Sequence, residues 1–195
     1  MSHLIVALIA FSALGQSWSS QGNKEGVHLE ARKVQGSAFE ELRLTITLPA
    51  TPAQVCRAIW HPSAALEHGF RRRDTLLETA TERLTYEQIA APLVSDRDYT
   101  LHVTLGEGLE GGCHIAFETQ NNRGPAPVAG FVRIPAIRGG WDITRAATGG
   151  TQIVYIVYSE PGGGIPAFLT RGSQRTHAVE WMKLILSRVG EHAKS

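Results

Sequence analysis

The stretch EPGGGIPAFL, residues 160–169, joins a strand-like segment to an apolar segment that can start a helix. Three consecutive glycines at such a junction either cradle a phosphate group or allow a sharp reversal of the chain. A phosphate-binding Walker loop has the pattern GxxxxGK[ST], and here Ile165-Pro166 stands where Lys-Ser/Thr is needed. No GxGxxG motif opens a βαβ unit either. The glycines therefore predict a strand-to-helix corner, with Pro166 in the first turn of the helix.

A long amphipathic helix is predicted after this corner, over residues 165–189, and Gly190 is placed to end it. Apolar or small residues recur along it at steps of three and four: Ile165, Phe168, Gly172, Thr176, Val179, Met182, Leu186 and Val189. Before the corner, alternating residues and turn residues predict antiparallel strands and one short helix that begins at Pro52. The strands span 42–48, 73–79, 82–90, 98–106, 111–119, 127–135, 138–146 and 150–159. A helix with one apolar face must bury it on the apolar side of such a sheet, which indicates an α+β fold.

Two of these segments form a predicted hairpin with one apolar side. The apolar residues are Tyr99, Leu101, Val103 and Leu105 in the first strand and Cys113, Ile115 and Phe117 in the second. Joining the two apolar faces predicts three cross-strand pairs: Tyr99 with Phe117, Leu101 with Ile115, and Val103 with Cys113. His102 and His114 lie on the other face, opposite each other in this register. They are either solvent-exposed residues without a functional role or a pair that chelates a metal or senses pH.

The 195-residue chain has the length of one domain and carries 19 basic and 18 acidic side chains, for a formal net charge of +1. This balance leaves no excess of positive charge, so no nucleic acid is expected as a partner. Neither CxxC nor HExxH is present to suggest a metal site, and no cofactor is expected. The run Arg71-Arg72-Arg73 is either a solvated loop or strand edge, which is favoured, or a transient contact for anionic membrane surfaces.

Export is predicted from the start of the chain, where residues 4–11 form an uncharged apolar run. The small residues Ala13 and Gly15 that follow it suit a signal peptidase. We therefore expect a cleaved signal peptide over 1–15, in preference to a membrane anchor or a buried first helix, and then a polar tether over 16–26. The mature protein would be periplasmic or secreted.

An exported protein would hold its two cysteines in an oxidising compartment. Cys56 falls in the short helix and Cys113 in a predicted strand. Spacing alone does not place them within bonding distance, so two small buried residues are favoured over one disulfide, which stays open.

Several segments together resemble one family. They are PLVSDRDY (92–99), GGW (139–141), GGTQIVYIVYSEPGGGIPAFL (149–169) and the closing helix. In this order they are similar to the START domain, the lipid-transfer family named after steroidogenic acute regulatory protein, over roughly residues 27–190. The resemblance implies a helix-grip fold, in which a curved antiparallel sheet wraps around the C-terminal helix. It also implies a tunnel between sheet and helix for one lipid or other hydrophobic small molecule.

The resemblance implies that inward-facing sheet residues and the underside of the last helix line this tunnel. The lining residues expected are Tyr99, Leu101, Val103, Ile115, Phe117, Phe168, Leu169, Gly172, Thr176 and Val179. Ile153 and Tyr155 are further candidates, but their strand is apolar on both faces and its orientation is open. For each residue, plain core packing is the competing interpretation. Gly172 and Thr176 are the more telling pair, because small residues on a buried helix face leave room for a ligand.

One departure from the family pattern limits what the resemblance implies. Sterol-binding relatives carry a cavity arginine six positions after the arginine of the S-x-R-D motif, and counting from Arg97 gives Val103. Sterol specificity therefore does not carry over to this chain. For Arg97 and its neighbours Asp96 and Asp98, fixing the turn into the strand is favoured over direct head-group binding.

Catalysis is the alternative to carriage, because polyketide cyclases and aromatases belong to the same helix-grip superfamily. The inward face offers only Tyr99, Tyr155 and Thr176 as candidate acids or bases, and no GxSxG motif is present. A lipid carrier or transfer protein without enzymatic activity is the leading hypothesis. A cyclase-like enzyme is the second, and an interaction module with a filled core is the third.

Overall fold

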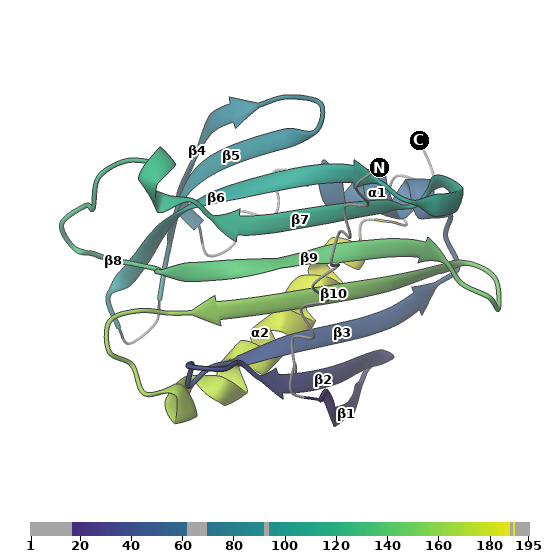
Figure 1. Ribbon diagram of the computed structural model, residues 1–195, viewed down its shortest axis with the longest axis horizontal. Coiled ribbons are helices and arrows are strands. Elements are labelled where there is room, and N and C mark those ends of the chain that lie inside the picture. Colours follow the sequence, from purple (N-terminus) through teal and green to yellow (C-terminus); the bar gives the residue numbers. More distant parts are fainter. Residues whose placement is uncertain (1–16, 62–69, 92–93, 188, 190–195) are drawn as a thin grey trace, which may run out of the picture.

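The structure, a computed structural model, describes residues 17–61, 70–91, 94–187 and 189. In this part of the chain a ten-stranded sheet curves around one long C-terminal helix (Figure 1). The predicted α+β class and helix-grip architecture are confirmed. The predicted signal peptide over 1–15 lies outside the described residues. No described helix has both the length and the apolar character to cross a membrane.

The strands follow the order β1-β2-β3-β10-β9-β7-β6-β5-β4 across the sheet, and each pairs antiparallel with its neighbours. The short strand β8 lies off this path and pairs parallel with β6. The bounds are β1 Ser19–Lys24, β2 Val27–Lys33, β3 Glu40–Leu48, β4 Phe70–Glu78, β5 Glu82–Ile89, β6 Asp96–Glu107, β7 Cys113–Thr119, β8 Phe131–Arg133, β9 Ala136–Arg145 and β10 Thr151–Glu160. The α-helices are α1 Pro52–Trp60 and α2 Ala167–Leu186, and short 3₁₀ turns cover Leu109–Gly111 and Asn121–Arg123.

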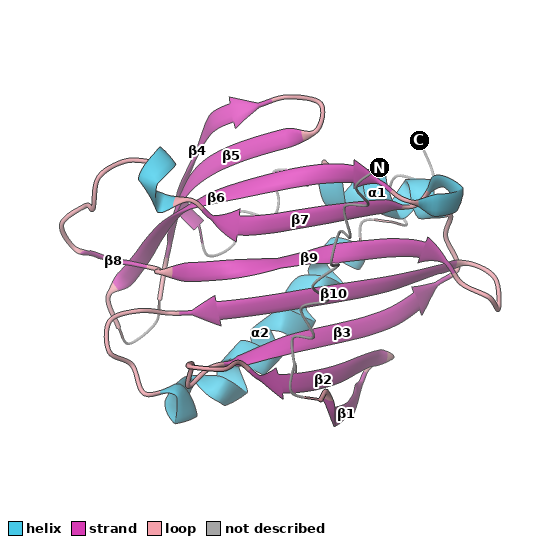
Figure 2. Cartoon of the chain, in the orientation of Figure 1, coloured by secondary structure: helices cyan, strands magenta, loops and turns pink. Residues whose placement is uncertain are grey.

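The short helix α1 begins where the sequence predicts. Thr51 caps it and forms a capping box with Gln54, which satisfies backbone donors that the first turn leaves unpaired. Both α-helices lie on the same side of the sheet (Figure 2), and α1 contacts β7, β9 and α2. Its apolar residues Val55, Ile59 and Trp60 are buried there. This helix therefore fills one end of the concave face.

The two cysteines form a disulfide, so the favoured reading of two unpaired residues is wrong. Cys56 of α1 is bonded to Cys113 at the start of β7, with 6.0 Å between the Cα atoms. The bond depends on α1 folding back over β7, a long-range contact that spacing in the sequence does not reveal. It ties α1 to the filled end of the sheet.

The long helix α2 is buried along its C-terminal half, as predicted, but its N-terminal half differs from the expectation. Ala178, Val179, Met182, Ile185 and Leu186 are buried, as is Val189 just beyond the helix. Phe168 is 72% exposed, Gly172 is exposed, and the side chain of Leu169 lies outside the described part. The residues seven positions before Met182 and Ala178 are Arg175, which is half-buried, and Arg171, which is exposed, and both pair with Glu40. The predicted face included Gly172 and Thr176 because Phe168, Gly172 and Thr176 were spaced by four residues twice in succession. Two such steps turn the face away from the side of the helix that is buried.

The β6–β7 hairpin keeps the predicted apolar side but not the predicted register. Val103 pairs with Phe117, four residues further along β7 than expected, and Leu105 pairs with Ile115. The strand β6 continues through Gly106 to Glu107, and the amide of Gly108 closes the loop by donating to the carbonyl of Gly112 at 3.1 Å. An even shift leaves every side chain on its original face, so apolar patterning alone does not detect it.

This register also separates the two histidines of the outer face. His102 pairs with Glu118, whereas His114 pairs with Gly106. Nε2 of His102 lies 2.8 Å from Oε1 of Glu82. Among the described residues no three His, Cys, Asp or Glu side chains converge as a metal site. The structure therefore does not bring the histidines together as the chelating alternative requires.

The predicted polar tether forms the first strand, so that part of the expectation is corrected. The strand β1 pairs with β2 while staying exposed along its length. Just before it, the Trp18 ring contacts the guanidinium groups of Arg32 and Arg43, at 4.4 and 4.5 Å from the ring centroid. These cation–π contacts and backbone pairing hold a segment that has little apolar surface to bury. The strand predicted over 127–135 is shorter than expected and corresponds to β8.

Candidate ligand-binding site

The two most specific motifs of the sequence meet in space. Arg97 of the S-D-R-D segment is 4% exposed, and its Nε donates a hydrogen bond to the carbonyl of Pro161 at 3.3 Å. The next residues, Gly162–Gly164, have φ of +69°, +70° and +69°, a left-handed conformation that side chains other than glycine rarely adopt. The predicted corner is therefore present, and Arg97 holds it in place.

The acidic neighbours of Arg97 are also engaged in structural contacts. Asp98 accepts two hydrogen bonds of 2.8 Å from Arg133 and one of 2.9 Å from the Tyr86 hydroxyl. Burial alone would raise the pKa of the Asp98 carboxyl, but these hydrogen bonds outweigh it and the pKa is lowered. Asp96 pairs with Arg71. These contacts favour the structural role over head-group binding.

The side chains on the concave face of the sheet are fully buried at one end of the strands and only half-buried further along. Cys113, Ile143 and Ile153 form a fully buried cross-strand row beside α1. Four residues further along β10, a parallel row across four strands is only half-buried. Its members are Val103, Phe117, Gly139 and Val157. The next row includes Leu101 and is half-buried as well. We call these two rows, together with the adjoining Tyr99, which is itself buried, the open half of the concave face.

The predicted lining residues divide between the two parts of this face. Tyr99, Leu101, Val103 and Phe117 lie in the open half. Ile115, Ile153, Tyr155 and Val179 belong to the buried core around α1 and α2. Tyr155 stacks on Trp141, with 4.1 Å between ring centroids, and lies 6.1 Å from Phe117. Thr176 is half-buried at the edge of the helix stripe. Which of them touch a ligand stays a prediction.

Sequence reasoning missed a polar cluster on the concave face. Arg73, Glu87 and Tyr99 form one cross-strand row over β4, β5 and β6. Nε of Arg73 donates to Oε1 of Glu87 at 2.9 Å, and Oγ1 of Thr85 donates to the same oxygen at 3.0 Å. Burial, and then the charge of Glu87, raises the pKa of the Tyr99 hydroxyl well above its usual value. Strand pairing is the signal that could have found this cluster, since the neighbour of an inward Tyr99 must also point inward.

The three consecutive arginines are each paired with a carboxylate. Arg71 pairs with Asp96, Arg72 with Asp74 and Arg73 with Glu87. Their strand β4 is the edge strand of the sheet. The strand-edge reading therefore fits the structure, and little unpaired positive charge is left to attract an anionic membrane.

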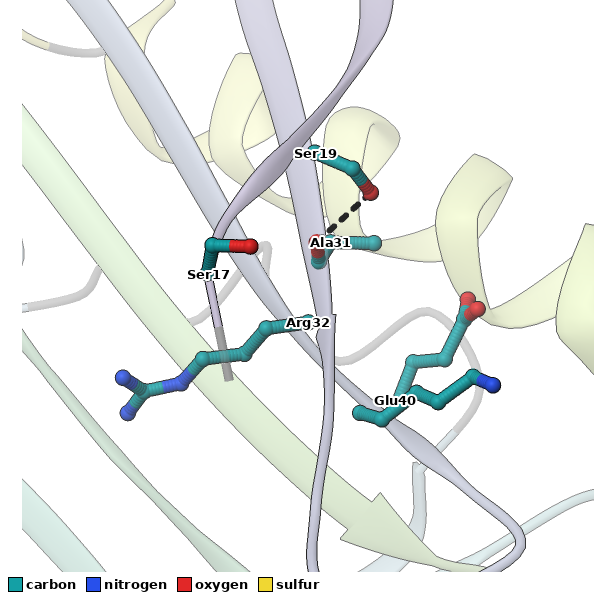
Figure 3. Close-up of a pocket in the computed structure, with 6 residues that line it drawn as sticks. Ser17, Ser19, Ala31, Arg32 and Glu40 are labelled. Carbon is teal, nitrogen blue, oxygen red and sulfur yellow. Dashed lines mark hydrogen bonds between the residues drawn. The ribbon is translucent and has the colours of Figure 1, made fainter. Parts of the chain in front are cut away.

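Two open depressions of about 400 Å³ each lie among polar residues, and neither has the apolar lining that a lipid needs. One is lined by Ser17, Ser19, Ala31, Arg32, Lys33 and Glu40 (Figure 3), where Ser19 Oγ donates to the carbonyl of Ala31 at 3.0 Å. The other lies on the outer face and is lined by His102, Thr104, Ala116, Phe117, Glu118, Gln120, Arg138 and Gly139. The open half of the concave face remains the better candidate.

No family model matches the chain. An uncharacterized protein of Pseudomonas aeruginosa is 27% identical over 165 residues, which cover 83% of this chain and 81% of that protein. The STAR-related lipid transfer protein of Xanthomonas axonopodis is 27% identical, with a TM-score of 0.76 over 88% of this chain and 98% of that one.

More distant solved structures share the fold alone. Human StAR-related lipid transfer protein 5 is 16% identical, with a TM-score of 0.74 over 94% of this chain and 90% of that chain. The Zhui aromatase/cyclase of Streptomyces is 12% identical, with a TM-score of 0.55 over 78% and 94% of the two chains. The lipid-transfer structures are thus closer in fold than the enzyme. Together with the joined S-D-R-D and PGGG motifs, these likenesses confirm the resemblance to START domains seen in the sequence.

Proposed function

We propose that this protein binds one lipid or other hydrophobic small molecule on its concave face and acts as a carrier. The observation that supports it best is the row Val103, Phe117 and Val157, which faces the interior and packs against the core but stays half-buried, whereas Ile115 and Tyr155 in the row on the α1 side are buried. Apolar surface placed against this row would leave water, at about 25 cal/mol per Å². The Xanthomonas relative, named a lipid transfer protein, supports the same reading.

The enzyme alternative has less support from the interior side chains. Burial raises the pKa of both Tyr99 and Tyr155, so the two phenols stay protonated near neutral pH and are poor bases. Glu87 already accepts hydrogen bonds from Arg73 and Thr85. Because an aromatase/cyclase shares the fold, the two functions are best separated directly. Incubation with the molecule recovered from the protein should leave the mass of that molecule unchanged in a carrier.

Export and membrane contact form part of this proposal. The Cys56–Cys113 disulfide supports a mature protein that is periplasmic or secreted, because cytosolic thiols are kept reduced. Transient membrane contact is better assigned to Phe168 at the start of α2, which is largely exposed, than to the paired arginines. Phe168→Ser should weaken binding to lipid vesicles, and Leu109→Ser should not, although Leu109 on the β6–β7 loop is even more exposed, at 85% compared with 72%.

A pair of substitutions on one strand tests the site. Val103 faces the concave side, whereas the next residue, Thr104, lies on the outer face. Native mass spectrometry of the purified protein should show an apolar molecule that a denatured control lacks. Val103→Trp should remove it by filling the open half, and Thr104→Trp should retain it. Equal loading of both variants would refute the placement, and a wild-type protein that never takes up a fluorescent lipid would refute the carrier.

A further inference from the structure

Strand β10 places apolar side chains on the outer face of the sheet, the face turned away from the two α-helices (Figure 2). When one face of an antiparallel sheet meets water, the residues on that face are normally polar. On this face β6 presents His102 and Thr104, which follow the rule. Strand β10 instead presents Val154 and Ile156, and both are half-buried. No described helix covers these two residues, so their surface is available to a partner.

Three cross-strand rows make up this part of the outer face, and together we call them the outer patch. The middle row consists of uncharged residues: Thr104, Ala116, Gly140 and Ile156. The row two residues to one side consists of Glu118, Arg138 and Tyr158. The row two residues to the other side consists of His114, Asp142 and Val154. On β9 the two flanking rows therefore carry opposite charges, Arg138 in one and Asp142 in the other.

We propose that the protein forms a symmetric dimer through the outer patch, so that the partner is a second copy of this chain. In a two-fold dimer both copies use the same surface, and each contact therefore occurs twice. A two-fold rotation about an axis along the middle row exchanges the two flanking rows. It brings Arg138 of one copy opposite Asp142 of the other, and Glu118 opposite His114. The proposal is independent of the carrier function, because it uses the face that points away from the concave site.

The charges that the rotation brings together are available in a single copy. Glu118 and Arg138 are direct cross-strand neighbours, yet within the described part of the chain they form no ion pair with each other. The guanidinium of Arg138 lies over the ring of Tyr158 instead, 3.9 Å from its centroid. Both Arg138 and Glu118 are exposed. Asp142 contacts only the exposed His114, so it too can accept from an arginine of a second copy.

The middle row allows the two sheets to approach closely. Ala116 and Gly140 carry almost no side chain and pair directly with each other across β7 and β9. Next to them, Ile156 meets its own counterpart in the second copy, so apolar surface is buried against apolar surface. The centre of the contact is therefore apolar and its margins are charged, which is the usual anatomy of a protein interface.

A hollow and a projecting side chain within the outer patch match under the same rotation. The depression of about 400 Å³ on this face includes His102, Thr104 and Glu118 in its lining. His114 projects from the surface, since its side chain is 55% exposed and its neighbour on β6 is Gly106. The rotation places His114 of the second copy above Glu118, at the lining of the depression. Each copy thus offers one imidazole ring and receives one.

The charges at the two ends of the middle row are already compensated within one copy. The row continues to Glu82 on β5 and to Arg43 on β3. Glu82 pairs with Arg123 at 3.5 Å, and Arg43 pairs with Glu30 at 2.6 Å. The rotation brings each end of the row to its own counterpart, and these internal partners reduce the repulsion there.

The outer patch is small for an interface. From β6 to β10 it crosses three strand spacings, about 14 Å, and across its three rows it spans four residues, about 13 Å. A stable complex buries about 800 Å² on each partner, which is more than this patch offers. We therefore expect a weak dimer whose population depends on the protein concentration.

Sedimentation velocity of the full mature protein at concentrations from about 1 to about 200 μM tests the dimer in the range expected for weak complexes. The sedimentation coefficient of the wild-type protein should rise with concentration towards that of a dimer. Arg138→Asp places an aspartate opposite Asp142 of the second copy in both pairs, and it should weaken dimerisation by about tenfold or more. Asp142→Arg places two arginines opposite each other and should weaken it to a similar extent.

The two substitutions combined give the sharpest test of the symmetry. In Arg138→Asp/Asp142→Arg the charges are exchanged, so each pair is again of opposite sign. Dimerisation should return to within about threefold of the wild-type affinity, because the two residues are coupled. Arg145→Asp makes the same charge change as Arg138→Asp at the end of β9, beyond the outer patch, and should leave dimerisation unaltered.

Three results would overturn the proposal. A wild-type protein that stays monomeric over the whole range excludes a second copy as the partner of the outer patch. A double variant as weak as the single variants shows that Arg138 and Asp142 do not pair across the two-fold axis. An Arg145→Asp variant weakened as much as Arg138→Asp shows that overall charge, and not this patch, controls the association.

Discussion

Two ends of one concave surface behave differently in this molecule. At one end, Cys113, Ile143 and Ile153 are buried beneath α1 and the C-terminal half of α2. About 13 Å away along the same strands, Val103, Phe117 and Val157 point to the same side but are only half-buried. Both ends are apolar and belong to one sheet, so the difference comes from what covers them. Stability is concentrated at the packed end, which leaves the open half available for a ligand.

The helix α2 spans both ends and shows the same division. Its C-terminal half carries the buried residues Met182 and Ile185. Its N-terminal half is held by polar contacts instead, with Nη2 of Arg175 2.7 Å from Oε2 of Glu40 and Nε2 of Gln174 donating to the carbonyl of Ser159 at 3.0 Å. Polar contacts exchange with water more readily than packed apolar groups do. The part of α2 above the open half is therefore the part suited to move when a ligand enters.

Removal of the disulfide should produce the largest loss of stability, because it releases the packed end. Replacing Cys56 and Cys113 by serine frees a loop with a sequence separation of 57 residues. Chain entropy then predicts a loss of about 4 kcal/mol in the free energy of unfolding. Urea denaturation of the oxidised protein and the double variant measures this. Folded protein should still bind its ligand, and a loss of binding without a loss of stability would contradict the division into two ends.

Truncation of one side chain in each part should give the next largest effect on the free energy of unfolding. Ile153→Ala leaves a cavity in the closed row and should cost about 3 kcal/mol. Val103→Ala removes a side chain that is already incompletely packed and should cost about 1 kcal/mol.

Ligand affinity should show the opposite order in these two variants. Val103→Ala is expected to change the affinity for a fluorescent lipid, and Ile153→Ala is not. Similar costs at both positions in denaturation experiments would mean that the concave face is packed uniformly.

The division could be predicted in outline from the sequence, because its determinants are local. Alternation along residues 98–119 identified the apolar side of β6 and β7 correctly, and the glycines of EPGGGIPAFL marked the corner before α2. Periodicity also identified Val179, Met182 and Leu186 as the buried face of α2.

The remainder depends on contacts between distant segments. The hairpin register, with Val103 opposite Phe117, is compatible with the same alternation as the predicted one. The Cys56–Cys113 bond and the Arg73–Glu87 pair each need two segments to be placed side by side. The strand β1 has almost no apolar signal, since its stability comes from backbone pairing and from Trp18. Local patterns identify faces, whereas partners come only from the assembled sheet.

Lowering the pH should destabilise the start of β6, near the corner, before it destabilises the packed end of the sheet. The Asp98 pKa is lowered in the folded protein, so this contribution is present above the unfolded pKa of about 3.9 and is lost as the pH falls through the folded value. Asp98→Asn should therefore cost about 2 kcal/mol at pH 7, and the difference from wild type should shrink below about pH 4.

Hydrogen exchange at several pH values locates the effect. Below about pH 4, amides of β6 and β8 around Asp98 and Arg133 should lose protection before those of β10 near Ile153. Simultaneous loss in both regions would indicate one cooperative unit with no weaker end.

Two glycines should respond to alanine with opposite signs, each by about 1 kcal/mol. Gly163 lies in the corner with φ of +70°, and a side chain there would adopt a left-handed conformation and press on Val132, so Gly163→Ala should destabilise the protein. Gly172 lies inside α2 with no atom within 4 Å of an added Cβ, so Gly172→Ala should stabilise the helix. The two glycines thus have different reasons to be present: one is required by the backbone, and the other is not. If Gly172→Ala raises the melting temperature and slows ligand uptake, the weak helical preference at this position serves the movement of α2 above the open half. Faster or unchanged uptake would leave Gly172 without a role in ligand entry.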